Sequence, residues 1–205
     1  MGFSCENLVC TDQTHTVNLR VVTEEDRGKG FVRPKDYTDI DGLVTDVPGL
    51  VLAAFYADCV PLYLVDPVRR CIGLSHAGWR GTVGKIGKKT VELMREQYGS
   101  SPEDLVAAIG PSICQSCYEV SKDVIEKFQE AFDERFWPEL FYEKDGEKYQ
   151  LNLWRANELG FLEAGVRPER IAAAGVCTCC NPGLLFSHRA SRGRRGNLGA
   201  FLMLK

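Results

Sequence analysis

Histidine is scarce in this chain, and its scarcity limits the metal chemistry that the protein can support. Only three histidines occur among the 205 residues, namely His15, His76 and His188. Multinuclear copper centres are filled mainly with imidazole ligands, so three histidines cannot build one. A single metal ion with two imidazoles and one further ligand remains within reach.

The chain also lacks long hydrophobic runs and an excess of positive charge. Its longest apolar stretches, residues 47–57 and 61–65, are interrupted well short of the roughly 20 residues that span a bilayer. The net charge of −3 argues against a protein that mainly coats nucleic acid or anionic membrane. The first six residues have neither the basic start nor the apolar core of a signal peptide. We therefore expect a cytoplasmic protein with no nucleic-acid or membrane partner.

The composition is typical of a folded domain. Hydrophobic residues make up 44% of the chain and charged residues 26%, which allows enough apolar burial to offset conformational entropy. At this length one continuous core is possible, so a single domain over residues 1–205 is expected. The nine cysteines are too sparse for a disulfide scaffold, and in a reducing compartment they are thiols or metal ligands.

Strand-like and helix-like patterns alternate along the chain, which indicates an α/β or α+β unit. Asp145-Gly146 lies between two short strand-like segments and predicts a hairpin. Asn152 is placed to cap a following helix. The expected strands are 17–23, 50–57, 61–65, 71–75, 105–109, 171–176 and 198–204, and the expected helices are 81–98, 121–132 and 153–164.

Three segments place a potential metal ligand near an expected strand end, where functional sites are often assembled: His15, Cys59 and His76. One thiolate and two imidazoles are good zinc ligands, and three protein ligands leave the fourth tetrahedral position open. However, 44 and 17 residues separate these positions, so no local zinc motif is present. The residues alone favour a buried Cys59 thiol and two histidines bound to backbone groups.

Several blocks of the sequence closely resemble the YfiH family, which is also called the laccase-domain or polyphenol oxidase family. The resemblance covers nearly the whole chain in one order. Its most specific parts are the Asp-Cys-Val-Pro segment at 58–61 and the His-Ala-Gly-Trp-Arg-Gly segment at 76–81. The other matching segments are 13–15, 109–113, 117–120, 177–178 and 186–189.

This resemblance implies a fold, a metal site and an activity. The fold is α+β, with mixed β-sheets packed together and flanked by helices, as in the cytotoxic necrotizing factor-like cysteine hydrolases. The metal site is a Zn²⁺ ion held by His15, Cys59 and His76, with copper as the alternative metal. The activity is a zinc-dependent purine nucleoside phosphorylase that uses inorganic phosphate to split adenosine, inosine, guanosine and methylthioadenosine, and that also deaminates adenosine.

Four further residues are candidates for substrate binding or catalysis. Arg80 can bind phosphate through two parallel hydrogen bonds, or form a structural ion pair. Asp58, beside the expected thiolate, can act as a general acid or base, orient a zinc ligand or form a turn. Arg189 follows His188 in a basic loop and is a candidate substrate contact. Asp41 matches a family position for substrate binding, although a simple turn explains it equally well.

Other interpretations stay open at this point. Cys59 can be a nucleophile with His76 as base in a metal-free cysteine hydrolase. The chain can also be a copper enzyme with one His-Cys-His site, or a zinc-binding module without turnover. Because relatives usually carry an additional opening segment before the Gln-x-His motif, we expect a shortened chain or a late start site. Any phosphate or substrate contact that this segment supplies is then expected to be lost.

The cysteines near residues 114 and 177 raise the question of a second metal site. Cys114 and Cys117 form one Cys-x-x-Cys pair, and Cys177, Cys179 and Cys180 form a second group. The strong zinc pattern is two Cys-x-x-Cys pairs, and the second group is not interpreted as one. We therefore expect these residues to be core or loop thiols.

Overall fold

The computed structural model describes residues 2–205, and a six-stranded mixed sheet forms the centre of the fold. The strand order is β11-β7-β5-β6-β3-β2. The central pairs β7–β5, β5–β6 and β6–β3 are antiparallel, whereas the outer pairs β11–β7 and β3–β2 are parallel. The strands are β2 (Leu19–Val21), β3 (Gly42–Thr45), β5 (Val60–Asp66), β6 (Cys71–Ala77), β7 (Val106–Ile109) and β11 (Ile171–Ala173).

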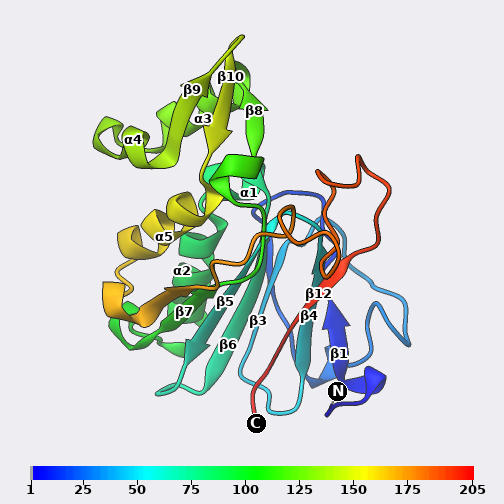
Figure 1. Ribbon diagram of the computed structural model, residues 1–205. Helices are drawn as coiled ribbons and strands as arrows, with labels where there is room; N and C mark the ends of the chain where they lie inside the picture. The colour runs from blue at the N-terminus through cyan, green and yellow to red at the C-terminus, as the bar shows by residue number, and fades with distance from the viewer. Residues whose placement is uncertain (1) are drawn as a thin grey trace.

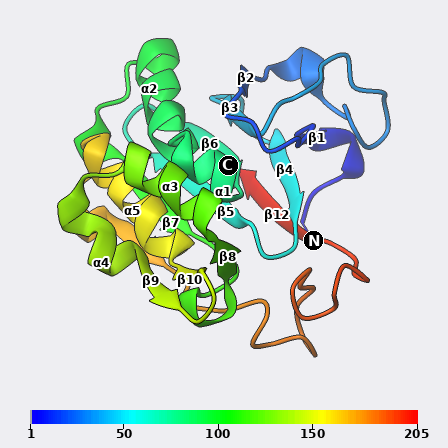
Figure 2. The ribbon, with the colours of Figure 1, turned by 90° about the horizontal axis from the view of Figure 1, so that it is seen from above.

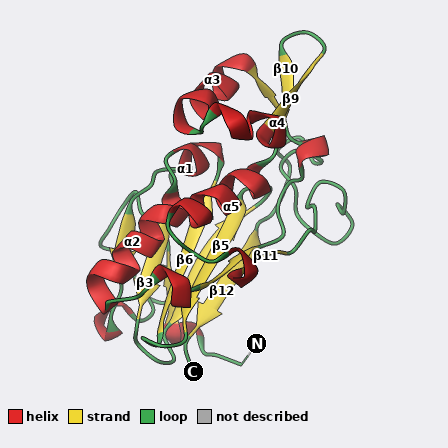
Figure 3. Cartoon of the chain, turned by 90° about the vertical axis from the view of Figure 1, so that its left-hand side faces the viewer, coloured by secondary structure: helices red, strands yellow, loops and turns green. Residues whose placement is uncertain are grey.

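Each face of this sheet is covered by a different layer (Figures 1 and 2). Helices α2 (Ile86–Tyr98) and α5 (Leu153–Glu163) lie on one face, and Figure 3 shows them in front of the strands. The other face packs against a three-stranded sheet in the order β1-β4-β12, made of β1 (Leu8–Cys10), β4 (Val51–Tyr56) and β12 (Leu198–Met203). The fold therefore has three layers: the helices, the six-stranded sheet and the three-stranded sheet.

The apolar runs in the sequence follow from this arrangement. Along β5, Leu62 and Leu64 pack into the core under the helices, while Tyr63 and Val65 pack toward the second sheet. A strand covered on both faces needs apolar residues at consecutive positions and loses the polar alternation of a half-exposed strand. The same rule explains β3, whose four residues are all buried.

A smaller unit lies beyond one end of the central sheet, at the top of Figure 1. Its antiparallel sheet has the order β8-β10-β9, and Asp145-Gly146 lies between β9 and β10 as predicted, with Gly146 at a φ of 68°. The unit contains β8 (Glu119–Ser121), α3 (Lys122–Ala131), α4 (Trp137–Leu140), β9 (Phe141–Lys144) and β10 (Lys148–Leu151). Short 3-10 turns occur at η1 (Cys5–Asn7), η2 (Glu24–Asp26), η3 (Pro102–Asp104), η4 (Gln115–Cys117), η5 (Glu134–Phe136) and η6 (Pro168–Arg170).

The expected fold of mixed sheets flanked by helices is confirmed, but one predicted helix is wrong. Residues 81–98 form two helices, because α1 (Trp79–Val83) ends at Gly84 and Lys85 takes a left-handed φ of 57° before α2 begins. The predicted strands 17–23 and 171–176 shorten to β2 and β11. Strands β1, β3 and β8 and helix α4 were not predicted, since three or four residues are too few for a periodic pattern. Within residues 2–205, no helix combines the length and apolarity that crossing a membrane requires.

Candidate metal centre and the cavity beside it

The register of the central sheet brings Cys59 and His76 together. His76 lies near the end of β6, opposite Pro61 of β5. The next pair is Val60 with Ala77, so Cys59, which immediately precedes β5, lies next to Gly78. Two residues far apart in sequence thus meet because β5 and β6 form one antiparallel pair.

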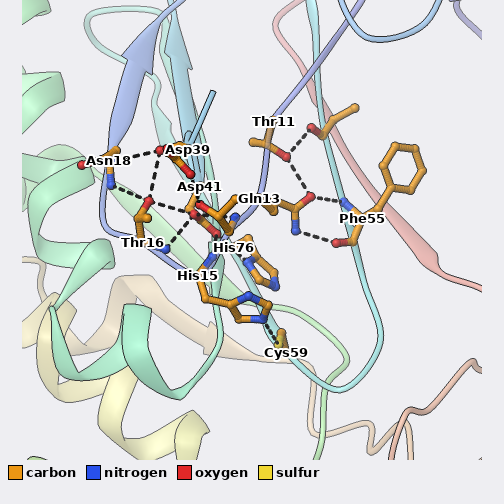
Figure 4. Close-up of polar contacts among 12 residues, drawn as sticks. Thr11, Gln13, His15, Thr16, Asn18, Asp39, Asp41, Phe55, Cys59 and His76 are labelled. Atoms are coloured by element: carbon orange, nitrogen blue, oxygen red, sulfur yellow. Dashed lines mark hydrogen bonds and ion pairs between the residues drawn. The ribbon is translucent and has the colours of Figure 1, made fainter. Parts of the chain in front are cut away.

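His15 reaches the same place from the loop between β1 and β2 (Figure 4). Its Nε2 lies 3.7 Å from the Sγ of Cys59, and its ring meets that of His76 edge to face with centroids 5.0 Å apart. One ligand atom from each of the three residues lies within 4.8 Å of the others. We call His15, Cys59 and His76 the candidate metal centre.

Asp41 holds two of these three residues in place. It is fully buried directly before β3, and its Oδ1 accepts hydrogen bonds from the backbone N–H of His15 at 3.1 Å and from Nδ1 of His76 at 2.9 Å. Its Oδ2 accepts from the backbone N–H groups of Thr14 and Thr16 and from the Thr16 hydroxyl. Because the Nδ1 of His76 is used in this way, its Nε2 is left for a metal ion. With no exposed surface, Asp41 is placed to orient His76 rather than to touch a substrate.

The electrostatics of the metal-free centre favour a thiolate beside an imidazolium. Burial alone would raise the pKa of Cys59, but hydrogen bonds from His15 and His76 outweigh it and lower the pKa to about 6. Burial alone would lower the pKa of His76, but Asp41 and Cys59 outweigh it and raise the pKa to about 9. Burial would likewise raise the pKa of Asp41, whereas its hydrogen bonds with His76, Thr16 and Thr14 lower it.

The residues fit a metal ion by chemistry and by space. Two imidazoles and one thiolate match the donors of a three-ligand zinc site, and also those of a trigonal copper site. Gly78 leaves room for this arrangement, because a Cβ there would lie 2.7 Å from Cδ2 of His15 and 3.2 Å from Sγ of Cys59. A side chain at position 78 would therefore force the His15 ring or the turn to shift.

A cavity of about 260 Å³ opens beside the candidate metal centre, and we call it the site cavity. Arg80 lies on its wall with the guanidinium 4.3 Å from the ring centroid of Trp79. None of the ion pairs found within residues 2–205 includes Arg80, so the alternative of a structural ion pair is not observed there. The lining residues are His15, Ala57, Asp58, Cys59, Gly78, Trp79, Arg80, Ile113, Tyr118, His188, Arg189 and Arg195.

Asp58 and Arg189 also line the site cavity, and they contact each other. The carboxylate of Asp58 accepts from the Thr178 hydroxyl at 2.6 Å and from the backbone N–H of Arg189 at 2.7 Å, so each oxygen has a partner within the chain. The Arg189 guanidinium donates to the carbonyl groups of Cys117 and Glu119. These contacts fix the loop after β11 against the cavity wall.

Sequence reasoning assigned no role to Trp79 and Tyr118 on this wall, and it named Arg195 only as part of the basic loop that follows His188. Both residues lie within segments that carry the resemblance, Trp79 in 76–81 and Tyr118 in 117–120, and this was the available signal. Tyr118 and Arg195 come from distant loops, and Arg195 contacts Nδ1 of His188 at 3.4 Å. A second cavity of about 350 Å³ shares His15, Ala57, Cys59 and Arg195 with the site cavity.

Comparison with known proteins identifies relatives over almost the full length. Purine nucleoside phosphorylase YlmD of Bacillus subtilis is 37% identical over 205 residues, covering 98% of this chain and 72% of its own. Adenosine deaminase RL5, from an unknown prokaryotic organism, is 36% identical over 190 residues, covering 92% and 72%. The crystal structure of the hypothetical protein YfiH from Bacillus licheniformis superimposes with a TM-score of 0.94 at 37% identity, covering all of this chain and 76% of the other.

The expected relationship to the YfiH family is thereby confirmed. One family model matches residues 1–205, from the first residue to the last. The chain belongs to the family described as multi-copper polyphenol oxidoreductase laccase.

Proposed function

We propose that this chain is a zinc-dependent purine nucleoside phosphorylase that also deaminates adenosine. The observation that carries the proposal is the convergence of His15, Cys59 and His76 at the edge of a cavity lined with arginines. Relatives named for these two activities are 36–37% identical to the chain over more than nine-tenths of its length. The nine free cysteines suit a reducing cytoplasm.

Arg80 is proposed to bind phosphate. In phosphorolysis the bond between the purine nitrogen and the sugar C1′ breaks, and a phosphate oxygen forms the new bond to C1′. This requires phosphate to be held at the sugar by cationic donors. The guanidinium of Arg80 has no carboxylate partner among the described residues and can offer two parallel N–H donors. Arg189 and Arg195 add positive charge to the same wall.

The aromatic residues of the wall are proposed to bind the purine ring. Trp79 and Tyr118 both line the site cavity and present flat apolar surfaces for a base. When bound at the candidate metal centre, zinc supplies a Lewis acid and lowers the pKa of water, as deamination at an amino-bearing ring carbon requires. Adenosine, inosine, guanosine and methylthioadenosine share the purine ring and are the proposed substrates.

Asp58 and Asp41 are proposed as positioning residues. One carboxylate oxygen of Asp58 accepts from the backbone N–H of Arg189, and the other accepts from the hydroxyl of Thr178. Asp41 holds His15 and His76. Both carboxylates can position these residues without exchanging a proton with the substrate.

A second candidate function follows from the lowered pKa of Cys59. A thiolate near neutral pH with a histidine in contact is the arrangement that a metal-free cysteine hydrolase needs. Metal analysis separates the two functions, since stoichiometric zinc bound through Cys59 occupies the nucleophile.

The direct test is a chromatographic assay of adenosine, inosine and methylthioadenosine with and without inorganic phosphate. We expect free base from all three only when phosphate is present, and conversion of adenosine to inosine without it. The Cys59→Ala variant should lose both reactions. The Cys5→Ala variant, which removes an exposed thiol near the N-terminus, should keep them. A zinc-loaded protein that releases no base from any of these nucleosides contradicts the proposal and supports a binding module.

A further inference from the structure

Four cysteine side chains converge at a place outside the candidate metal centre. They are Cys114, Cys117, Cys177 and Cys180, which we call the thiol cluster. Their sulfur atoms all lie within 4.8 Å of one another. The Cys117–Cys180 and Cys114–Cys180 sulfur pairs are 3.5 and 4.0 Å apart. For zinc bound to four thiolates at about 2.3 Å, tetrahedral geometry places the sulfurs about 3.8 Å apart.

The spacing of these cysteines matches the strong zinc pattern after all. Cys114 and Cys117 form one Cys-x-x-Cys pair, and Cys177 and Cys180 form a second. The sequence-based interpretation did not count the second pair because Cys179 stands inside it and obscures its spacing. Cys179 is not among the four cysteines whose sulfur atoms lie within 4.8 Å of one another, so it is not part of the thiol cluster.

The backbone around the cluster is arranged to support a thiolate. The N–H groups of Cys114 and Cys180 both point at the Sγ of Cys177, at 3.3 and 3.4 Å. Hydrogen bonds from backbone N–H groups favour the charged form of a ligand and fix its orientation. A thiol that only fills a core needs no such donors.

The cluster is also accessible to a metal ion from solvent. Cys180 is exposed, Cys114 and Cys117 are half-buried, and Cys177 is buried. By contrast, Cys10 and Cys71 are single buried cysteines in the sheets and represent ordinary core thiols. Four sulfurs gathered at an accessible turn are not explained by packing.

We propose that the thiol cluster binds a structural zinc ion through four thiolates, independently of the candidate metal centre. The ion joins two segments that are 63 residues apart, the turn before β8 and the loop after β11. Both segments build the site cavity. Ile113 and Tyr118 flank the first Cys-x-x-Cys pair and line the cavity, and Thr178 within the second pair donates to Asp58.

Zinc counts on purified variants test the proposal. Wild-type protein prepared in reductant without chelator should contain two zinc ions per chain by elemental analysis. Cys59→Ala and Cys180→Ser should each lose one. The matched control is Cys179→Ser, which changes the adjacent thiol outside the cluster and should keep both.

X-ray absorption at the zinc edge of the Cys59→Ala variant provides a measurement that does not require altering the cluster. With the candidate metal centre disabled, the remaining zinc should show an all-sulfur shell at about 2.3 Å. A single zinc in the wild type that Cys180→Ser leaves in place overturns the proposal. So does a metal-free wild-type protein whose mass shows a disulfide within the cluster.

Discussion

At the scale of single residues, one carboxylate controls the candidate metal centre. Oδ1 of Asp41 accepts from the backbone of His15 and from the ring of His76, so a shift of this one atom moves two of the three ligands. Its negative charge also keeps His76 basic. The centre therefore depends on a residue that the metal does not touch.

Replacing Asp41 should weaken metal binding without removing a ligand. In Asp41→Asn the amide loses the charge and one of the two acceptor atoms, so we expect zinc affinity to fall about 10- to 100-fold. Competition with a zinc-binding dye measures this. Asp39→Asn is the control, because Asp39 lies on the same loop and bonds the Thr14 hydroxyl but no ligand. Equal affinities for the two variants would refute the role of Asp41.

The lowered pKa of Cys59 has a measurable consequence in the metal-free protein. Alkylation requires the thiolate, so the rate at Cys59 should rise with pH around a midpoint of about 6, whereas an ordinary cysteine titrates near pH 8.5. Mass spectrometry of the modified peptide follows the reaction, and added zinc should suppress it. His76→Gln should move the midpoint upward. A wild-type midpoint at the ordinary value contradicts the described contacts.

At the scale of elements, the site is a product of strand pairing. Asp41 precedes β3, His76 lies in β6 and Cys59 precedes β5, and these three strands are neighbours in the central sheet. The turn from β6 into α1 then places Gly78 against His15 and Cys59. A shift of the backbone at this turn would therefore displace the side chains of His15 and Cys59.

Gly78→Ala should disrupt metal binding by steric conflict alone. The added Cβ meets His15 at 2.7 Å, which forces the ring or the turn to move. We expect less than one zinc at this centre after purification, measured by elemental analysis in a Cys180→Ser background. Gly160→Ala in α5 is the matched control, since a Cβ there meets no atom within 4 Å. Full zinc occupancy in Gly78→Ala would show that the contact is easily relieved.

At the scale of the whole molecule, the sequence predicts the sheets and long helices but not how they assemble the site. The apolar runs that become β4, β5 and β6 are readable because burial on both faces leaves a strong signal. The helix break at Lys85 is not readable from the sequence, because lysine is not a residue type that indicates a left-handed backbone. The convergence of His15 with Cys59 depends on pairing between distant strands. The residues alone therefore left it open as one of two interpretations, and the family resemblance predicted it.

The histidine count also bears on the copper chemistry in the family's description. His188 lies on the wall of the site cavity and is not among the three convergent ligands within the described residues. Residues 2–205 thus offer one mononuclear His-Cys-His site. We expect the purified, air-exposed protein to be colourless, as judged by its visible spectrum. Strong visible absorption would indicate copper at this site instead of zinc.

The most direct test of the account is restoration of activity by metal. Wild-type protein and Cys59→Ala are stripped with chelator, shown to be metal-free, and assayed for phosphate-dependent release of hypoxanthine from inosine before and after zinc is added. We predict that stripped wild type is inactive and regains turnover with zinc, while Cys59→Ala stays inactive. Full turnover by metal-free wild type would contradict the account.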